Sequence, residues 1–142
     1  MIQHEVSVYL NCPVQQVFEF LADVRNLRAW QSNLIENELL TESLLGVGSR
    51  FREVRQMGRR PTEIRAVMTD FEPNKRFATK TETEPQVTVC YTFNPEGGGT
   101  RLKYQFTMQT AGMMRLFEPM IAASIKKETE ADFGRLMQAL EQ

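Results

Sequence analysis

The sequence is poor in the residues on which most catalytic and metal sites depend. It has one histidine, His4, and two cysteines, Cys12 and Cys90, among 142 residues. The cysteines lie far apart and have no C-x-x-C spacing, which excludes a zinc-knuckle or thioredoxin-type motif. A single histidine and dispersed carboxylates also give no H-E-x-x-H or EF-hand spacing, so we expect neither a metal nor a cofactor.

Net charge and long apolar runs are lacking as well. The chain carries 17 Lys+Arg against 18 Asp+Glu, a formal charge of −1. Nucleic-acid-binding proteins usually carry a clustered excess of basic residues, so this balance argues against a nucleic-acid partner. No apolar stretch approaches the roughly 20 residues that span a bilayer, and the N-terminus has no basic segment followed by an apolar one. We therefore expect a cytoplasmic protein with no stable membrane insertion.

What is present is typical of one globular domain. The chain is 42% hydrophobic and 25% charged, and a chain of this length buries roughly 70% of its unfolded surface without disulfides. It contains no linker-like tract and no internal repeat. We expect a single domain over residues 1–142, and the sequence contains no signal for an oligomeric state.

Hydrophobic periodicity predicts the elements of the first three quarters of the chain. Residues 3–10 alternate and predict a half-buried strand with His4 on its apolar face. A short helix follows the N-cap and proline offered by Asn11-Cys12-Pro13, and a second helical turn, capped by Asp23, covers residues 24–30. Strands separated by glycine- and proline-rich turns are then expected at residues 34–41, 49–57, 62–71, 76–82, 86–94 and 100–109.

The C-terminal part is helical. After Gly112 the apolar residues recur every three or four positions up to Leu140. Because Pro119 lacks a backbone donor, we expect a kink or a short helix before it and the main helix from near Glu118. The whole order predicts an α+β domain in which an antiparallel sheet wraps one long helix.

Several short motifs, together with the terminal amphipathic helix, resemble one family in their order along the chain. The motifs are residues 11–21, 27–30, 46–51, 71–73, 91–93 and 98–102. They resemble the polyketide cyclase/dehydrase-like group of the START-related (SRPBCC, Bet v 1-like) superfamily. The resemblance implies a helix-grip fold, in which a seven-stranded antiparallel sheet curls around the C-terminal helix and two short helices close one end. Such proteins enclose an apolar cavity and bind sterols, phospholipids, plant hormones, quinones or aromatic polyketides, and a minority catalyse cyclisation and dehydration.

A cavity is also expected from the architecture, because one helix lying across a curved sheet cannot touch every inward side chain. Packing in the core is the competing interpretation for each large apolar residue. Eight methionines favour an adaptable site. The expected ligand-binding residues are Trp30, Phe51, Tyr91, Phe93, Tyr104, Phe106, Met108, Phe117, Met120 and Ile121.

Chemistry beyond binding has few candidates. Tyr91 and Tyr104 are the weak catalytic candidates, since their hydroxyls could orient a ligand carbonyl or exchange protons with it. His4 lies on the apolar face at the start of a strand, where it could act as a base. The competing interpretation is that it is a residue at the rim of the sheet. In the arginine-rich strands, Arg50 and Arg52 could meet an anionic head group if they pointed inward, and ion pairing across the solvated face is the alternative.

The sequence therefore predicts the binding of a small hydrophobic molecule, aromatic, lipid-like or polyketide-like, between the sheet and the C-terminal helix. The alternative is a cyclase or dehydratase acting on a polyketide-type substrate, although the chain lacks the His and Asp pairing that would support acid/base catalysis. A further alternative is a protein or membrane interaction module built on the helix pair and the arginine-rich strands.

Overall fold

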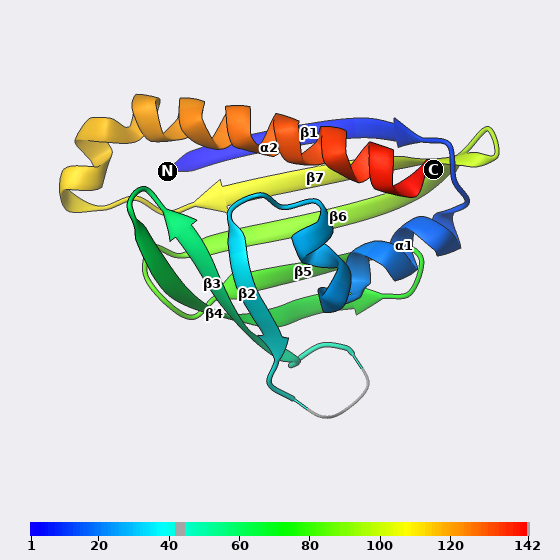
Figure 1. The fold of residues 1–142 in the computed structure, drawn as a ribbon, viewed down its shortest axis with the longest axis horizontal. Helices are drawn as coiled ribbons and strands as arrows, with labels where there is room; N and C mark the ends of the chain where they lie inside the picture. The colour runs from blue at the N-terminus through cyan, green and yellow to red at the C-terminus, as the bar shows by residue number, and fades with distance from the viewer. Residues whose placement is uncertain (42–44, 142) are drawn as a thin grey trace.

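A computed structural model describes residues 1–41 and 45–141 of the chain. A seven-stranded antiparallel sheet curls around one long C-terminal helix (Figure 1). The strands are β1 (Ile2–Leu10), β2 (Leu34–Leu39), β3 (Arg50–Met57), β4 (Arg60–Glu72), β5 (Arg76–Thr81), β6 (Val87–Glu96) and β7 (Gly99–Met108). The helices are α1 (Val14–Ala22), the 3₁₀ turns η1 (Val24–Ala29) and η2 (Gly112–Phe117), and α2 (Glu118–Leu140). The expected α+β helix-grip fold is confirmed, and each predicted strand begins and ends within two residues of the observed one.

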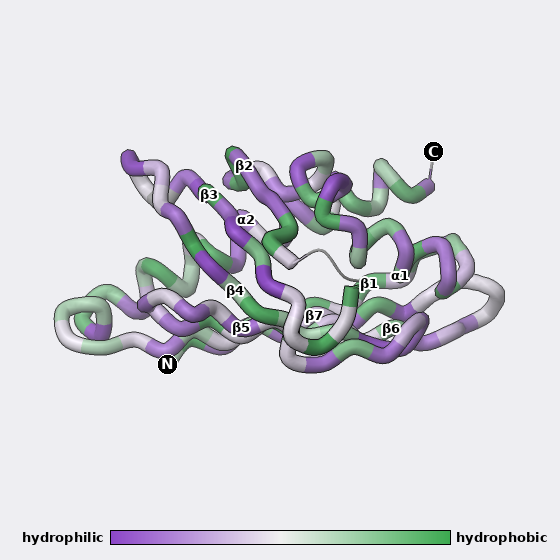
Figure 2. The backbone as a smooth tube through the Cα atoms, turned by 90° about the horizontal axis from the view of Figure 1, so that it is seen from below, coloured by the Kyte–Doolittle hydropathy of each residue, from purple (hydrophilic) through white to green (hydrophobic). Residues whose placement is uncertain are grey.

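The sheet order places the first strand beside the last. The order is β1-β7-β6-β5-β4-β3-β2, so β1 and β2 are the two edges. β1 pairs with β7 from Ile2 opposite Met108 to Leu10 opposite Thr100. The other strands pair with their neighbours in the chain, and Figure 2 shows β2 and β3 curving away from the layer formed by β5, β6 and β7. This curvature holds the sheet apart from α2 over part of its length.

Two helix starts illustrate how the sequence sets the boundaries. The N-cap of α1 is Pro13 and no side chain caps it, so the expectation that Asn11-Cys12 would supply the cap is wrong. The carbonyl of Pro13 instead accepts the first helical hydrogen bond, from the backbone N–H of Val17 at 3.1 Å. Pro119 lies in the first turn of α2, after η2, where its missing N–H removes no helical hydrogen bond. Asp23 caps η1 as predicted, accepting from the backbone N–H of Arg25 at 2.9 Å.

The β6–β7 hairpin depends on a close approach at Gly99. A Cβ atom there would lie 2.4 Å from the Tyr9 hydroxyl and 2.5 Å from the Leu10 carbonyl oxygen. The Tyr9 hydroxyl donates to the Glu96 carbonyl at 3.1 Å, which ties β1 to the end of the hairpin. Only glycine fits at this position without moving either strand.

The core lies toward one end of the molecule, under the second half of α2. The buried residues of α2 are Asp132, Phe133, Leu136 and Leu140, all in that half. Phe18 of α1 closes the same end, with its ring centroid 5.1 Å from that of Phe93. The first half of α2 contributes no buried residue, so it bridges the curled sheet instead of packing into it.

Candidate functional site

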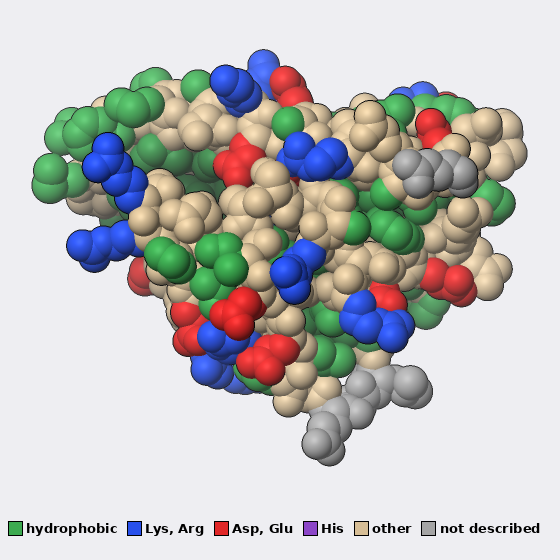
Figure 3. All heavy atoms as spheres, viewed as in Figure 1, with side chains coloured by type: hydrophobic (Ala, Val, Ile, Leu, Met, Phe, Trp, Pro, Cys, Tyr) green, Lys and Arg blue, Asp and Glu red, His purple; other side chains and the backbone are tan. Residues whose placement is uncertain are grey.

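A cavity of about 660 Å³ lies beneath the first half of α2. Figure 3 shows the surface hollowed beside this part of the helix. Small-molecule sites commonly enclose about 300–1,000 Å³, so the cavity is large enough for a ligand of several rings. Most of its wall is apolar, and side chains from β3 to β7 and from α2 contribute to it; they include Phe51, Ala66, Met68, Phe77, Val89, Phe106, Met108, Ile121 and Ile125.

The structure brings most of the residues expected to bind ligand to this one cavity. Eight of them line the cavity: Trp30, Phe51, Tyr91, Tyr104, Phe106, Met108, Met120 and Ile121. The expectation is wrong for Phe93 and Phe117, which are not among the lining residues. Phe93 follows Tyr91 on the same face of β6, but one step nearer the end that Phe18 of α1 fills. Phe117 ends η2 and is 47% exposed on the outer surface.

The two tyrosines lie next to each other on the wall. The ring centroids of Tyr91 and Tyr104 are 5.2 Å apart, and Tyr104 also packs against Phe133. Burial raises the pKa of both hydroxyls above their ordinary value of 10.0, and for Tyr91 the neighbouring Tyr104 adds to the effect. Both hydroxyls are therefore protonated at neutral pH and can orient a ligand by hydrogen bonds, whereas neither is suited to accept a proton.

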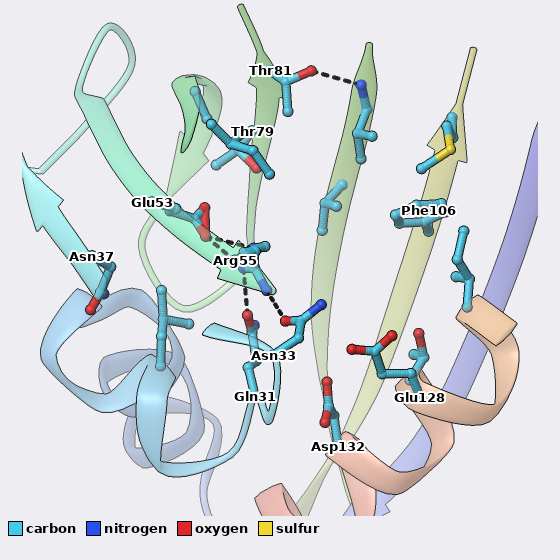
Figure 4. Close-up of a pocket in the computed structure, with 18 of the residues that line it drawn as sticks. Gln31, Asn33, Asn37, Glu53, Arg55, Thr79, Thr81, Phe106, Glu128 and Asp132 are labelled. Carbon is cyan, nitrogen blue, oxygen red and sulfur yellow. Dashed lines mark hydrogen bonds and ion pairs between the residues drawn. The ribbon is translucent and has the colours of Figure 1, made fainter. Parts of the chain in front are cut away.

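The cavity wall also contains a polar cluster built around Arg55 of β3 (Figure 4). Its guanidinium donates to Glu53 Oε2 from Nε at 3.0 Å and from Nη2 at 2.5 Å. It also donates from Nη1 to Asn33 Oδ1 at 2.7 Å and from Nη2 to Gln31 Oε1 at 2.6 Å. The side chains of Arg55 and Glu53 are only 21% and 17% exposed, so this ion pair is partly shielded from water.

Two carboxyl groups of α2 face this cluster across the cavity (Figure 4). Asp132 accepts from the backbone N–H of Ser32 at 3.2 Å and from its hydroxyl at 3.1 Å, and it also pairs with Arg135. These bonds hold the segment after η1, which carries Gln31 and Asn33, against the helix. Glu128 lies one turn earlier; burial and, to a smaller extent, the charge of Asp132 raise the pKa of its carboxyl group.

Sequence reasoning missed this polar cluster, although β3 carried a signal for it. Alternation places Phe51, Glu53 and Arg55 on one face of the strand, and the sequence predicts that Phe51 points inward. Arg50 and Arg52 accordingly point outward and pair with glutamates, Arg52 with Glu63 of the neighbouring strand β4 at 2.5 Å and Arg50 with Glu82, directly after β5, at 3.3 Å. The inward orientation considered for these two arginines is therefore wrong, and ion pairing on the outer face is confirmed. The polar residues of the cavity wall that the sequence did not predict include Gln31, Asn33, Glu53, Arg55, Glu128 and Asp132.

The remaining candidates lie outside the cavity or have no partner. His4 does not line it; its Nε2 is buried and has no hydrogen-bond partner among the described residues.

Cys12 and Cys90 are free. Within residues 1–41 and 45–141, no group of three or more His, Cys, Asp or Glu side chains could hold a metal ion. In the same part of the chain, no helix is long and apolar enough to cross a membrane.

An apolar patch adjoins the cavity where η2 meets α2. It consists of Met113, Leu116, Phe117 and Met120, which are 74%, 76%, 47% and 66% exposed. Figure 3 shows hydrophobic side chains gathered over this end of α2. Because Met120 and the neighbouring Met114 also line the cavity, the patch is part of its rim. We call these four residues the rim patch.

Comparisons with known proteins agree with this fold. Residues 1–141 match a family model described as polyketide cyclase/dehydrase and lipid transport. The fold is similar to that of TTHA0849 from Thermus thermophilus, with a TM-score of 0.82 and 15% identity over 97% of this chain and 96% of that one. It is also similar to the Zhui aromatase/cyclase from Streptomyces sp. R1128, with a TM-score of 0.78 and 19% identity over 98% and 93% of the two chains. A search of curated proteins gives no match to the sequence.

Proposed function

The chain belongs to the polyketide cyclase/dehydrase and lipid transport family, and from this membership and its cavity we propose that it binds a small hydrophobic ligand beneath the first half of α2. The observation that carries the proposal is the cavity itself: about 660 Å³, walled mainly by apolar side chains, with a smaller number of polar groups from β3, from the segment after η1 and from α2. This combination is typical of sites that bury an apolar ligand and orient it by a small number of hydrogen bonds. Aromatic, lipid-like and polyketide-like molecules all have the required character.

Filling the cavity tests this proposal. Thr79 of β5 lines the cavity and its side chain points into it (Figure 4), so Thr79→Trp should occupy ligand volume. We expect the wild type to bind the uncharged dye Nile red saturably in a fluorescence titration, and the variant to bind it at least tenfold more weakly. Thr88→Trp is the matched control, because Thr88 is exposed on the neighbouring strand β6.

Two results would contradict the proposal. One is a wild type that fails to bind Nile red and any member of a panel of quinones, sterols, fatty acids and phenolics. The other is a folded Thr79→Trp protein, verified by circular dichroism, that binds the dye as tightly as the wild type.

The second candidate function is cyclisation or dehydration of a polyketide-type substrate in the same cavity. Glu128 favours it over the two tyrosines, because a carboxyl group whose pKa is raised by burial can donate and accept protons closer to neutral pH. The test is turnover of a linear poly-β-ketone thioester. An enzyme should lose turnover in Glu128→Gln and keep it in Glu130→Gln, since Glu130 is exposed on the same helix. A wild-type protein that does not accelerate the reaction above its background rate excludes this function for that substrate.

A further inference from the structure

The charged groups on the cavity wall are mostly acidic. Arg55 is the one cation among the described lining residues, and it faces the carboxyl groups of Glu53, Glu128 and Asp132. A fourth carboxyl, Glu38, lies nearer the surface and pairs with Arg52 at 3.5 Å. Glu53 pairs with Arg55, Asp132 with Arg135 and Glu38 with Arg52, which leaves Glu128 as the lining carboxyl group without an ion pair to a described residue. An anionic ligand would therefore meet an excess of one negative charge and no unpaired cation, in surroundings less polar than water.

Arg55 is also not free to bind an anion. A guanidinium has five N–H groups, and four of those on Arg55 are engaged: two by Glu53, one by Gln31 and one by Asn33. The carboxylate closest to Arg55 is therefore that of Glu53, which belongs to the same strand of the protein. An arginine that binds the carboxylate or phosphate of a ligand would instead have two free N–H groups directed at the ligand.

The four bonds instead fix the orientation of two amides. A guanidinium only donates, so Gln31 and Asn33 must turn their oxygens toward Arg55. Their NH₂ groups then point away from Arg55, and both residues line the cavity. Neither NH₂ group donates a hydrogen bond to a described residue, so both remain available to an acceptor on a ligand.

We infer that the cavity takes a ligand whose polar end is an uncharged, oxygen-bearing group such as a ketone, held by the amide donors of Gln31 and Asn33, and that it discriminates against the corresponding carboxylate. Arg55 is then a positioning residue that orients the two amides and does not itself neutralise the ligand. The inference rests on the proposed binding function and specifies the chemical class of ligand for the same cavity.

A matched pair of probes tests the selectivity. The ketone 2-acetylnaphthalene and the carboxylate 2-naphthoate have nearly the same shape and differ in charge. We expect the ketone to displace Nile red from the wild type at a concentration at least tenfold lower than naphthoate. Equal or stronger displacement by naphthoate, or no displacement by the ketone, overturns the inference, whereas a wild type that binds neither Nile red nor any member of the ligand panel overturns the proposed function itself.

Glu53→Gln should change the selectivity in a predictable direction. Removing this carboxylate leaves the Arg55 charge uncompensated by its nearest partner, so the affinity for naphthoate should rise at least tenfold while that for the ketone changes less than threefold. Glu63→Gln makes the same charge change on the outer face, where Glu63 pairs with Arg52, and should alter neither affinity. Unchanged naphthoate binding in a folded Glu53→Gln protein counts against the inference.

Gln31→Ala provides an independent check if Glu53→Gln does not fold. Loss of one neutral hydrogen bond costs about 0.5–1.5 kcal/mol, so binding of the ketone should weaken about two- to tenfold. Gln15→Ala is the matched control, because the Gln15 amide is exposed on α1 and bonds to Glu19 outside the cavity, so the affinity for the ketone should stay within twofold of the wild type. A ketone affinity that does not change overturns the role assigned to this amide.

Discussion

Arg52 and Arg55 show how much depends on the position of a single residue in a strand. They are three residues apart on β3 and therefore point to opposite faces of the sheet. Arg52 pairs on the outer face with Glu36, Glu38 and Glu63, where such pairs contribute about 0–1 kcal/mol. Arg55 instead orients two amides in the cavity wall, so the same residue type has a structural role on one face and a role in the site on the other.

Two glycines should respond in opposite ways to replacement by alanine. Gly99→Ala would place its Cβ 2.4 Å from the Tyr9 hydroxyl and 2.5 Å from a backbone oxygen, and overpacking of this kind costs about 1–3 kcal/mol. Gly134→Ala meets no atom within 4 Å on the exposed side of α2 and should stabilise the protein by about 0.5–1 kcal/mol. Urea unfolding of both variants measures the difference. Stability of Gly99→Ala equal to that of the wild type would show that the hairpin relaxes without cost.

Glu128 should make stability depend on pH. Burial raises the pKa of its carboxyl group above the ordinary value of 4.5, so the folded protein retains this proton to a higher pH than the unfolded chain does. The resulting loss of stability is absent below pH 4.5, develops as the pH rises through the folded-state pKa, and is complete above it. We therefore expect Glu128→Gln to be more stable than the wild type near neutral pH, with the difference vanishing in acid.

Urea unfolding of Glu128→Gln across this pH range measures the effect. Glu130→Gln is the matched control, because Glu130 is exposed on the same helix. A stability difference for Glu128→Gln that is the same at every pH would show that burial of the carboxylate is not its cause.

At the scale of elements, α2 has two halves with different roles. Its second half supplies all of its buried residues, whereas its first half spans the cavity. The hydrophobic periodicity of the sequence is similar in both halves, which is why it predicts the helix but not this division. What separates them is the curvature of the sheet below, a property of all seven strands together.

Truncating one apolar residue in each half should show this division. Leu136 is 0% exposed, and Leu136→Ala should cost about 2–5 kcal/mol because it leaves a void in a packed core. Met120→Ala should cost less than about 0.5 kcal/mol, as surface substitutions usually do, because Met120 is 66% exposed. Thermal or urea unfolding compares the two, and similar losses would mean that the first half also packs into the core.

The difference between local signals and tertiary structure also explains which features can be predicted from the sequence. Alternation and turn residues predict the strands closely, and Pro119 predicts the start of α2, because these signals act locally. Gln31 and Asn33 carry no such signal, since they follow η1 in an irregular segment whose position is set by Asp132, a hundred residues further along the chain. Strand alternation on β3 is enough to predict that Arg55 faces the cavity. The positions of Gln31 and Asn33 can be known only from the tertiary structure.

At the scale of the whole molecule, ligand binding should increase the free energy of unfolding. A ligand present at 100 times its Kd adds about 2.7 kcal/mol if it binds only the folded state. For a chain of this size each kcal/mol raises Tm by about 2–4 °C, so a saturating ligand should raise Tm by about 5–10 °C. Differential scanning fluorimetry with 2-acetylnaphthalene measures the shift. An equal shift in Thr79→Trp would place the binding outside the cavity.

The rim patch gives the protein a chemical sensitivity that its interior lacks. Thioether sulfurs oxidise readily to sulfoxides when they are exposed, and the patch contains Met113 and Met120, whereas Met68 and Met108 are buried. Under mild hydrogen peroxide, peptide mass spectrometry should find Met113 and Met120 oxidised before Met68 and Met108. The entrance of an apolar cavity would thus become polar while its walls stay unchanged, so oxidative damage would affect ligand entry before it affects the fold.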